Sequence, residues 1–599
     1  MWLGYQGASA RPAPLRPINF RLLRPATLSA RDNIGSGYVA VPYPPPELEL
    51  KNKVLGIVED GNWALFTSST VAVSDEKPSS RVVLSPNLTT CHQSLSDADV
   101  PVYCCPPKPE SDEPFIDFKF PDESQPIRVR RPAHLVDKEY IAKYNKALTI
   151  MRSLPYDDPR NFIRQANMHC LYCTGAYNQK HSNALLKIHR SWMFFPWHRM
   201  MIYFHERIIG SLMGDDTFAL PFWNWDAPEG MVIPIMHMNG SFIDPDRDSS
   251  HLPPTVTDDN YNHVESGLGP EEQITANVAL MYHQMVSGAK KMELFMGCPY
   301  KAGENGFCDA PGTIELAPHN TLHTWVGSNL NPEREDMGAF YSAARDPIFY
   351  AHHSNIDRLW EVWKGLRGKN QATLIDDPDW LDTYFFFHNE KLQLVRIKIR
   401  DVLDITNLRY TYQEVENPWL NARPKPSVPP QMARHMLKMR DNNQNGLLFP
   451  SNNLMSDFGP EGRTLDTIIR VRVYRPKTDR TKKEKEEEEE VLLVYGIDVK
   501  KDMYAKFDVF VNAVDETTIG PESREFAGTF VNVRRGVKRV MNEGDDVVVK
   551  RKTNIKLGIS ELLEDLEADG DESIWVSLVP RGGTGLNIAV DGVRIEYLR

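Results

Sequence analysis

The chain has 599 residues, of which 41% are hydrophobic and 25% are charged, which is the balance of a globular protein with more than one domain. The formal net charge of -12 argues against a nucleic-acid partner, because phosphate binding needs a clustered positive surface. No run of about 18 uninterrupted apolar residues occurs, so we expect no membrane-spanning helix.

The N-terminal region has the charge balance of an organelle transit peptide. Residues 1–31 contain five arginines but no lysine and no acidic residue, although serine is scarce. We therefore expect a targeting region over residues 1–90.

The cysteines are clustered and odd in number, which predicts disulfides plus one sulfur with another task. Disulfides imply an oxidising compartment. The run Met168–Cys173, MHCLYC, has a histidine directly before a Cys-x-x-Cys pair. On sequence alone it could be a redox dithiol, half of a zinc site, a scrambled haem attachment motif or three residues with separate partners. The seven cysteines are Cys91, Cys104, Cys105, Cys170, Cys173, Cys298 and Cys308.

Helical periodicity dominates the middle of the chain. It predicts helices over Asp137–Leu154, Phe194–Leu212, about His319–Trp325 and Asp346–Leu366. The main body is therefore expected to be a helix-rich domain.

The histidines of this body form a pattern that suits metal binding. In the second half, His319 and His323 are four residues apart, which on a helix places them on one face in adjacent turns. His352 and His353 are neighbours and diverge by roughly 100° on a helix, so at most one of them can face the same centre.

The first half offers a matching set in His169, His189 and His198. Sites made only of imidazoles suit copper, because magnesium and calcium prefer oxygen and structural zinc often takes thiolates. His205 shares a helix face with His198 but lies about 10 Å further along the axis, too far to share its metal.

A second, β-rich domain is predicted after a proline-rich and polar linker over residues 421–464. ARPKPSVPP, Ala422–Pro430, can continue neither a helix nor a central strand, and the linker composition predicts an exposed, poorly structured target for proteolysis. The charge run Thr481–Glu490 is expected to be a solvated loop. Alternation of apolar and polar residues predicts strands within residues 465–599, at 469–473, 491–499, 506–514, 573–580 and 593–597.

Several segments resemble the two copper-binding regions of the plant polyphenol oxidases, the catechol oxidase and tyrosinase group. They are HCLYCTGAY, HRSWMFFPWHR, ALPFWNWDAPEGM, PHNTLHTWVG and DPIFYAHHSNIDRLW. Tyr410 and Tyr412 match the Tyr-x-Tyr that ends the family's catalytic domain, and YAKFDVFVN, Tyr504–Asn512, resembles its C-terminal lysine-phenylalanine-aspartate-valine motif.

The resemblance covers roughly residues 91–599. It implies a mainly α catalytic domain over residues 91–420, a four-helix bundle around a dicopper site, followed by a β-rich sandwich over residues 465–599 that shields the site. It also implies the ligands of two copper ions. One ion would be held by His169, His189 and His198, and the other by His319, His323 and His353, with His352 left outside.

The family's covalent links carry over to the cysteines. They imply a thioether between Cys173 and His189 and the disulfides Cys91–Cys105 and Cys104–Cys170. We add a third disulfide, Cys298–Cys308, as a hypothesis, because the spacing and the glycines between them permit a small loop.

The resemblance also assigns roles around the metals. Glu315 and Asn320 would hold a water that takes a proton from a monophenol. Phe340 matches the aromatic gate over the second copper. Asp357, one turn after His353, is expected to support the ligands by hydrogen bonding.

The implied function is the oxidation of o-diphenols to o-quinones by O2, and it is left open whether monophenols are also hydroxylated. The enzyme would stay latent until a protease cuts the linker. The alternatives are a haemocyanin-like oxygen carrier and a specialised phenolic biosynthetic enzyme of the same fold. The family implies the thylakoid lumen of the plastid, while the atypical N-terminus keeps a vacuolar or secretory route as an alternative. The oligomeric state is not predicted.

Overall fold

The computed structural model describes residues 82–95, 101–107, 114–264, 266–304, 310–328, 330–331, 335–367, 376–443, 455–499, 503–534, 541–542, 545–546 and 552–599. All of them belong to one compact unit, Ser79–Arg599. Most of the predicted targeting region therefore lies outside the described residues. Within the described ranges, no helix is both long enough and apolar enough to cross a bilayer.

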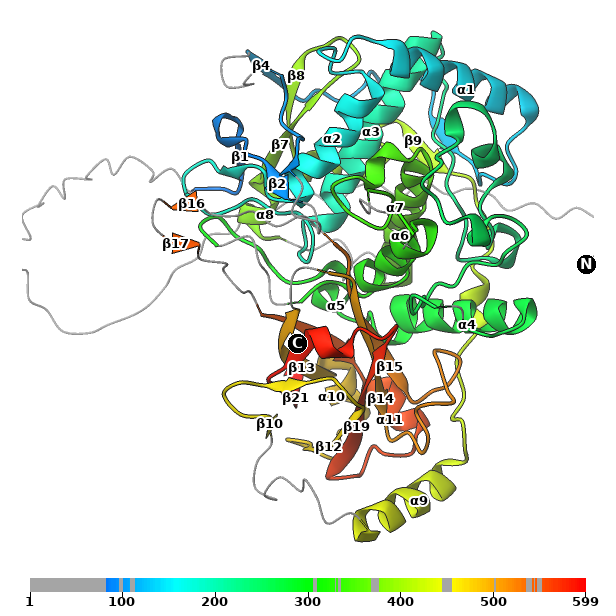
Figure 1. Cartoon of the computed structure of the whole chain (residues 1–599), viewed down its shortest axis with the longest axis vertical. Helices are drawn as coiled ribbons and strands as arrows, with labels where there is room; N and C mark the ends of the chain where they lie inside the picture. Colours follow the sequence, from blue (N-terminus) through cyan, green and yellow to red (C-terminus); the bar gives the residue numbers. More distant parts are fainter. Residues whose placement is uncertain are drawn as a thin grey trace, which may run out of the picture. The chain divides into compact units, whose positions relative to one another are not determined.

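A helical domain forms the first part of this unit (Figure 1). Its main helices are α1 (Lys138–Ser153), α2 (Phe162–Cys173), α3 (Phe194–Met213), α4 (Pro270–Tyr282), α5 (Met292–Met296), α6 (Asn320–Val326), α7 (Ile348–Arg367) and α8 (Pro378–Asp382). The four predicted helices correspond to α1, α3, α6 and α7. The sequence reasoning missed α2, which is one of the helices that carry the site.

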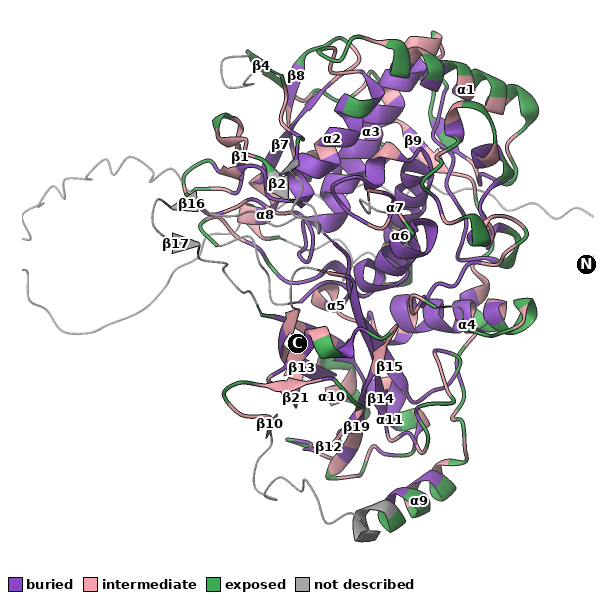
Figure 2. Cartoon of the chain, in the orientation of Figure 1, coloured by how far each residue is buried: buried purple, intermediate pink, exposed green. Residues whose placement is uncertain are grey.

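Helix α3 is the centre of the helical domain. It is mostly apolar and buried on nearly every side, and such a helix is stable only when it is surrounded by protein. It contacts both α1 and α7, and Figure 2 shows it coloured as buried. The helix ends at Gly214, which has a left-handed backbone with φ of 66° and so closes the last turn without strain. This buried helix gives the site a rigid frame.

Asp357 joins the Tyr-x-Tyr segment to helix α7. The short strands β5 (Arg128–Arg130) and β9 (Tyr410–Tyr412) pair in parallel, and the hydroxyls of Tyr410 and Tyr412 both donate to the Asp357 carboxylate. Arg130 and Arg199 donate to the same carboxylate. The prediction that Asp357 hydrogen-bonds a copper ligand is therefore wrong, because these four donors occupy it.

Part of the predicted linker is helical. Helix α9 (Pro430–Asn443) begins at a proline, which suits the first turn of a helix because its missing N–H has no partner there. Ala433 and Leu437 are buried, and Arg434 donates to the backbone oxygen of Glu567. The expectation of a poorly structured linker is wrong for these residues.

The C-terminal domain is a β-sandwich, as expected. One sheet has the order β10-β21-β13-β20-β11 with β18 also on β13, and the other has the order β12-β19-β14-β15. One apolar cluster takes side chains from both sheets, including Val471, Leu492, Phe507 and Val576. The strands are β10 (Met455–Asp457), β11 (Arg463–Thr464), β12 (Ile469–Tyr474), β13 (Glu489–Val499), β14 (Ala505–Val511), β15 (Phe526–Asn532), β18 (Thr553–Gly558), β19 (Ser573–Arg581), β20 (Ile588–Val590) and β21 (Gly592–Leu598).

The charge run that was expected to be a loop forms ordered structure. Thr481 and Glu484 make a capping box at the start of helix α10 (Lys482–Glu487). Glu490, at the end of the run, is buried in β13 and pairs with Arg475 at 2.7 Å. The partner arginine makes burial of this carboxylate tolerable, which composition alone does not reveal.

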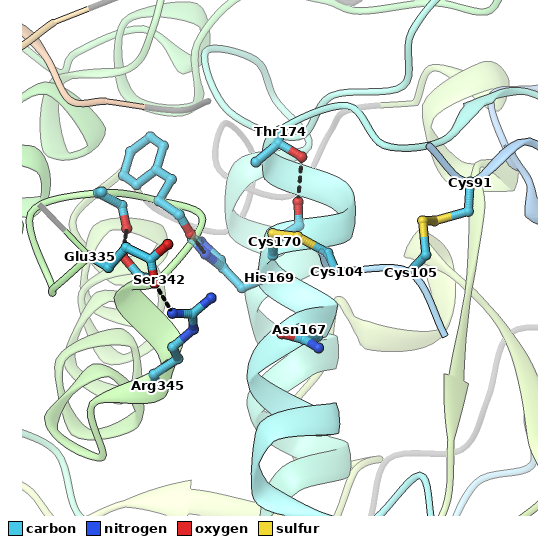
Figure 3. Close-up of a disulfide and its surroundings, with 12 residues drawn as sticks. Cys91, Cys104, Cys105, Asn167, His169, Cys170, Thr174, Glu335, Ser342 and Arg345 are labelled. Atoms are coloured by element: carbon cyan, nitrogen blue, oxygen red, sulfur yellow. Dashed lines mark hydrogen bonds and ion pairs between the residues drawn. A yellow bond between two sulfur atoms is a disulfide. The ribbon is translucent and has the colours of Figure 1, made fainter. Parts of the chain in front are cut away.

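One disulfide closes a loop within the N-terminal segment, and a second fastens that segment to helix α2 (Figure 3). Cys91 is joined to Cys105 and Cys104 to Cys170, each pair with Cα atoms 5.8 Å apart. Cys170 lies on α2, directly after His169. Cys298 is disulfide-bonded as well, while Cys308, its predicted partner, lies outside the described residues.

Candidate metal centre

The first histidine cluster is assembled from three separate parts of the helical domain. His169 lies on α2, His198 lies on α3, and His189 lies in the segment that precedes α3. All three are buried, and one ligand atom from each, together with the sulfur of Cys173, lies within 4.8 Å of the others.

The second cluster lies on two neighbouring helices. His319 directly precedes α6, His323 lies on α6, and His352 and His353 lie on α7. Their ligand atoms also lie within 4.8 Å of one another, and every one of these rings is fully buried.

The two clusters adjoin each other in one buried space. The rings of His198 and His353 are stacked with centroids 4.3 Å apart, and those of His169 and His353 lie 6.1 Å apart. Two metal ions held by these clusters would therefore be neighbours.

Backbone oxygens fix the orientation of three rings. The Nδ1 atoms of His169 and His198 lie 2.7 Å from the carbonyl oxygens of Phe340 and Phe194, and that of His323 lies 2.9 Å from the oxygen of Met337. A carbonyl can only accept, so in each neutral ring Nδ1 carries the hydrogen and Nε2 keeps its lone pair. This is the tautomer that a metal ligand bound through Nε2 requires.

Side-chain oxygens fix the orientation of two further histidine rings. Nδ1 of His189 lies 3.0 Å from Oε1 of Glu315, and Nδ1 of His319 lies 2.9 Å from Oδ1 of Asn320. The buried Nε2 atoms of His198 and His319 have no hydrogen-bond partner, which is costly unless a ligand uses them. The donor set thus fits metal ions that prefer imidazole, copper among them.

Burial keeps these rings neutral. It lowers the pKa of His198 to about 3 and that of His323 to about 4, because a charged ring would lose its hydration. Neutral imidazole is the form that binds a metal at physiological pH.

His352 differs from the other histidines of its cluster. The indole Nε1–H of Trp225 donates to its Nδ1 at 3.1 Å. Nδ1 must then be the unprotonated nitrogen, so the neutral ring carries its hydrogen on Nε2 and offers no lone pair there. His353 instead directs Nε2 to within 3.4 Å of Nε2 of His323.

The predicted gate lies elsewhere than the resemblance implies. The resemblance places Phe340 over the second copper, whereas its ring stacks on His189 of the first cluster, with centroids 4.0 Å apart and planes inclined by 14°. The ring of His323 is farther away, at 5.5 Å. Phe340 therefore borders both clusters but packs closely on the first.

Glu315 and Asn320 are brought to the site, each with partners of its own. Oε1 of Glu315 accepts from the His189 ring and, at 2.7 Å, from the backbone N–H of Arg190. Asn320 accepts from His319 and donates through Nδ2 to the backbone oxygen of Val531 at 3.3 Å. The water that the two are predicted to share stays a prediction.

Strand β15 of the C-terminal domain covers the site, and no pattern in the sequence identified it. Nδ2 of Asn320 donates to the oxygen of Val531 in β15 at 3.3 Å, and the N–H of Phe340 donates to the oxygen of Arg534, two residues after β15, at 2.8 Å. Val531 and Val533 belong to the apolar core of the helical domain. The apolar run FAGTFVNV could have predicted a buried strand here, but nothing in it indicates a contact with the metal centre.

Two all-histidine clusters in a helical domain, followed by a β-sandwich, define a binuclear copper protein of type 3, and the comparisons with known proteins agree. The sequence matches the common central domain of tyrosinase over residues 159–366, the polyphenol oxidase middle domain over residues 375–425 and the chloroplastic polyphenol oxidase C-terminal domain over residues 461–597.

Curated relatives extend the match over most of the chain. Aureusidin synthase of Antirrhinum majus is 47% identical over 86% of this chain and 88% of its own length. A chloroplastic polyphenol oxidase of Malus domestica is 42% identical over 92% and 89%. The structure of latent apple tyrosinase superposes with a TM-score of 0.71 at 43% identity, covering 81% of this chain and all of that one. The chain therefore belongs to the plant polyphenol oxidase family and is a phenol-oxidising copper oxidoreductase with two copper ions.

Proposed function

We propose that this protein oxidises o-diphenols to o-quinones with O2, with one copper on His169, His189 and His198 and the other on His319, His323 and His353. The observation that carries the proposal is the set of five rings whose Nδ1 atoms are each held by a carbonyl or side-chain oxygen. This arrangement turns the Nε2 lone pairs toward a common buried space.

The reaction balances without any further reactant. Two diphenols each lose two electrons and two protons to become quinones, and one O2 takes up the four electrons and four protons to give two waters. When bound, the copper pair supplies the O2-binding and electron-accepting chemistry. The protein's own contribution is to hold the imidazoles in one tautomer and to exclude water, since the rings are buried.

Hydroxylation of monophenols is part of the proposal and depends on Glu315 and Asn320. A carboxylate and an amide next to the ligands His189 and His319 are suited to orient one water as a base. The amide Nδ2 of Asn320 is engaged by Val531 while the C-terminal domain is in place. We therefore expect hydroxylation only after that domain is displaced.

The proposed latency is explained by strand β15 of the C-terminal domain. Strand β15 contacts residues next to ligands in both clusters, so it occupies the approach to the metals. Cleavage within the linker, residues 421–464, would let the C-terminal domain leave. The part of the linker between α9 and β10 lies outside the described residues.

Two further features come from the family. The sulfur of Cys173 lies within 4.8 Å of the ligand atoms of the first cluster, which supports the proposed thioether to His189. Relatives from Malus domestica and Vitis vinifera are named as chloroplastic, and we propose a plastid location for this protein on that basis.

A specialised biosynthetic role is the second candidate. Aureusidin synthase is 47% identical over 86% of this chain, and (+)-larreatricin hydroxylase of Larrea tridentata is 40% identical over 92% of it, so both match its sequence about as well as the general oxidases do. A panel of phenols separates the two roles, since a biosynthetic enzyme accepts one phenol far better than simple catechols.

The testing experiment is oxygen uptake by copper-loaded protein before and after limited proteolysis in the linker. We expect uptake with a catechol that rises on cleavage, and a monophenol trace that reports on Glu315 and Asn320. Two bound coppers without quinone formation from any phenol would favour an oxygen carrier and contradict the proposal.

A further inference from the structure

A small sheet of the helical domain ends in an exposed strand that takes no part in the chemistry proposed above. The sheet has the order β4-β8-β7, in which β4 spans Phe115–Asp117, β8 spans Leu394–Lys398 and β7 spans Tyr384–His388. Figure 1 shows β4 at the outer margin of the domain. All of its residues are exposed. An edge strand of this kind can pair with another chain.

The free backbone groups of this edge follow from its pairing with β8. The two strands are parallel, and the N–H of Phe118 donates to the oxygen of Arg396 at 2.9 Å. In a parallel ladder every second residue bonds the neighbouring strand, so Ile116 and Phe118 face β8. Asp117 and Lys119 therefore direct their N–H and C=O groups to the opposite side. No group of the described residues bonds them there.

One face of this segment is apolar. The ring of Phe118 packs against those of Tyr203 and Phe204 on α3, which anchors the segment to the helical domain. Ile116 and Phe120 lie on the same face, because side chains alternate along a strand. They are 41% and 50% exposed, so two apolar side chains stay in water beside an anchored ring.

The other face carries one charge of each sign. Oδ1 of Asp117 accepts from Nε of Arg396 at 2.6 Å, and the Asp117 side chain is 66% exposed. Lys119 is exposed and makes no ion pair with any described residue. The segment therefore presents an acidic and a basic side chain, two residues apart, at the positions whose backbone groups are free.

We propose that this edge pairs with the same edge of a second copy of the chain, which gives a two-fold symmetric dimer. When the two segments run antiparallel and are centred on Phe118, Asp117 of each copy lies opposite Lys119 of the other, and each such pair exchanges two backbone hydrogen bonds. Opposite charges then meet on one face of the joined sheet, and Ile116 meets Phe120 on the other. Residues 116–120, IDFKF, are thus complementary to themselves, which favours a second copy as the partner.

Sedimentation velocity of the full-length, copper-loaded protein tests for this dimer. The natural sequence should be dimeric at about 100 µM and dissociate on dilution, as expected for a small interface, and salt should favour the monomer. Lys119→Asp and Asp117→Lys each place like charges opposite one another, so each protein alone should dimerise about tenfold more weakly. An equimolar mixture of the two should recover the natural affinity, because opposite charges meet again.

Lys391→Asp is the matched control, because Lys391 is an exposed lysine in the turn between β7 and β8 of the same sheet. This protein should dimerise as the natural sequence does. Hydrogen exchange gives a second measurement that needs no variant. The amides of Asp117 and Lys119 should exchange about tenfold more slowly at high than at low protein concentration.

Each outcome decides the matter. A natural sequence that stays monomeric at about 100 µM, with no slowing of exchange at these amides, would overturn the proposal. A dimer that neither charge substitution weakens would also overturn it, because the interface would then lie elsewhere. The same holds for a mixture that dimerises no better than its components. If a variant fails to fold, the exchange of the natural sequence decides.

Discussion

The two histidine clusters reach the same coordination chemistry by different routes. The first combines residues from α2, α3 and the segment before α3, with the sulfur of Cys173 alongside. The second combines two residues one turn apart, His319 and His323, with His353 on α7. The first depends on tertiary packing and the second mainly on helical spacing.

The difference also appears in how the rings are held. In the first cluster, His169 and His189 depend on Phe340 and Glu315, which are distant in sequence and lie beside the second cluster. The half of the chain that supplies the second cluster therefore helps to orient the first. This dependence predicts that damage around the second cluster disturbs the copper of the first as well.

Removal of a ligand should have the largest effect. Replacing His198 or His323 with alanine takes away an Nε2 donor that no neighbouring residue supplies, so we expect at least one copper per chain to be lost and oxidation to fall below detection. Metal analysis and oxygen uptake measure both effects. His181→Ala is the control, because His181 is exposed and should leave both coppers in place. Retention of two coppers by either ligand variant would refute the assignment.

The neighbouring histidines of α7, His352 and His353, are expected to differ in copper binding. We expect His353→Gln to lose copper and His352→Gln to keep both ions, because Nδ1 of His352 is bonded to Trp225. His352→Gln should lower the free energy of unfolding by about 1–3 kcal/mol, since it removes a buried acceptor. Metal analysis and denaturant unfolding test this pair. Loss of copper from the His352 variant with copper retained in the His353 variant would reverse the assignment.

The sequence predicts these two clusters unequally. The second is visible in it, because the spacing of His319 and His323 suits one helix face and the adjacency of His352 and His353 excludes one of the two. The first was predicted only as a matching set of three histidines, because α2 was missed and no helical spacing links His169 to His189. The β-sandwich could be predicted from strand periodicity. Its contact with the metal centre through Val531 and Arg534 could not, because these contacts are made by backbone oxygens, which every residue type has.

The next largest effect should come from a hydrogen bond that joins the C-terminal domain to the helical domain. Nζ of Lys506 donates to Oδ1 of Asn262 at 2.8 Å while it pairs with the buried Asp508. Asn262→Ala removes the acceptor on the helical domain but keeps that ion pair. The C-terminal domain should therefore move away from the metal centre more often. We expect the oxidation of catechol by the uncut chain to rise about tenfold, because hydrogen bonds to charged groups are worth about 1.5–3 kcal/mol.

Asn389→Ala is the control for this prediction, because Asn389 is another loop amide of the helical domain and bonds only locally, to Gln393 and Lys391. Oxygen uptake by intact protein, with gel electrophoresis to exclude cleavage, is the measurement. A rate unchanged in Asn262→Ala but still raised by proteolysis would show that this bond does not maintain latency.

The smallest effect should come from the sulfur that only the first cluster has. Cys173 is buried beside the ligand atoms of its cluster, and a thioether to His189 would fix that ring by a covalent bond in addition to Glu315. Because Glu315 and the packing of Phe340 already orient the ring, Cys173→Ser should keep both coppers and lower the oxidation rate only several-fold. Peptide mass spectrometry of the natural sequence should find the peptides of Cys173 and His189 joined, with a mass two hydrogens below the sum of the two. The Cys173→Ser protein should give the two peptides separately. Separate peptides in fully active, copper-loaded protein would show that hydrogen bonding and packing suffice to hold His189, and the two clusters would then be held by the same means.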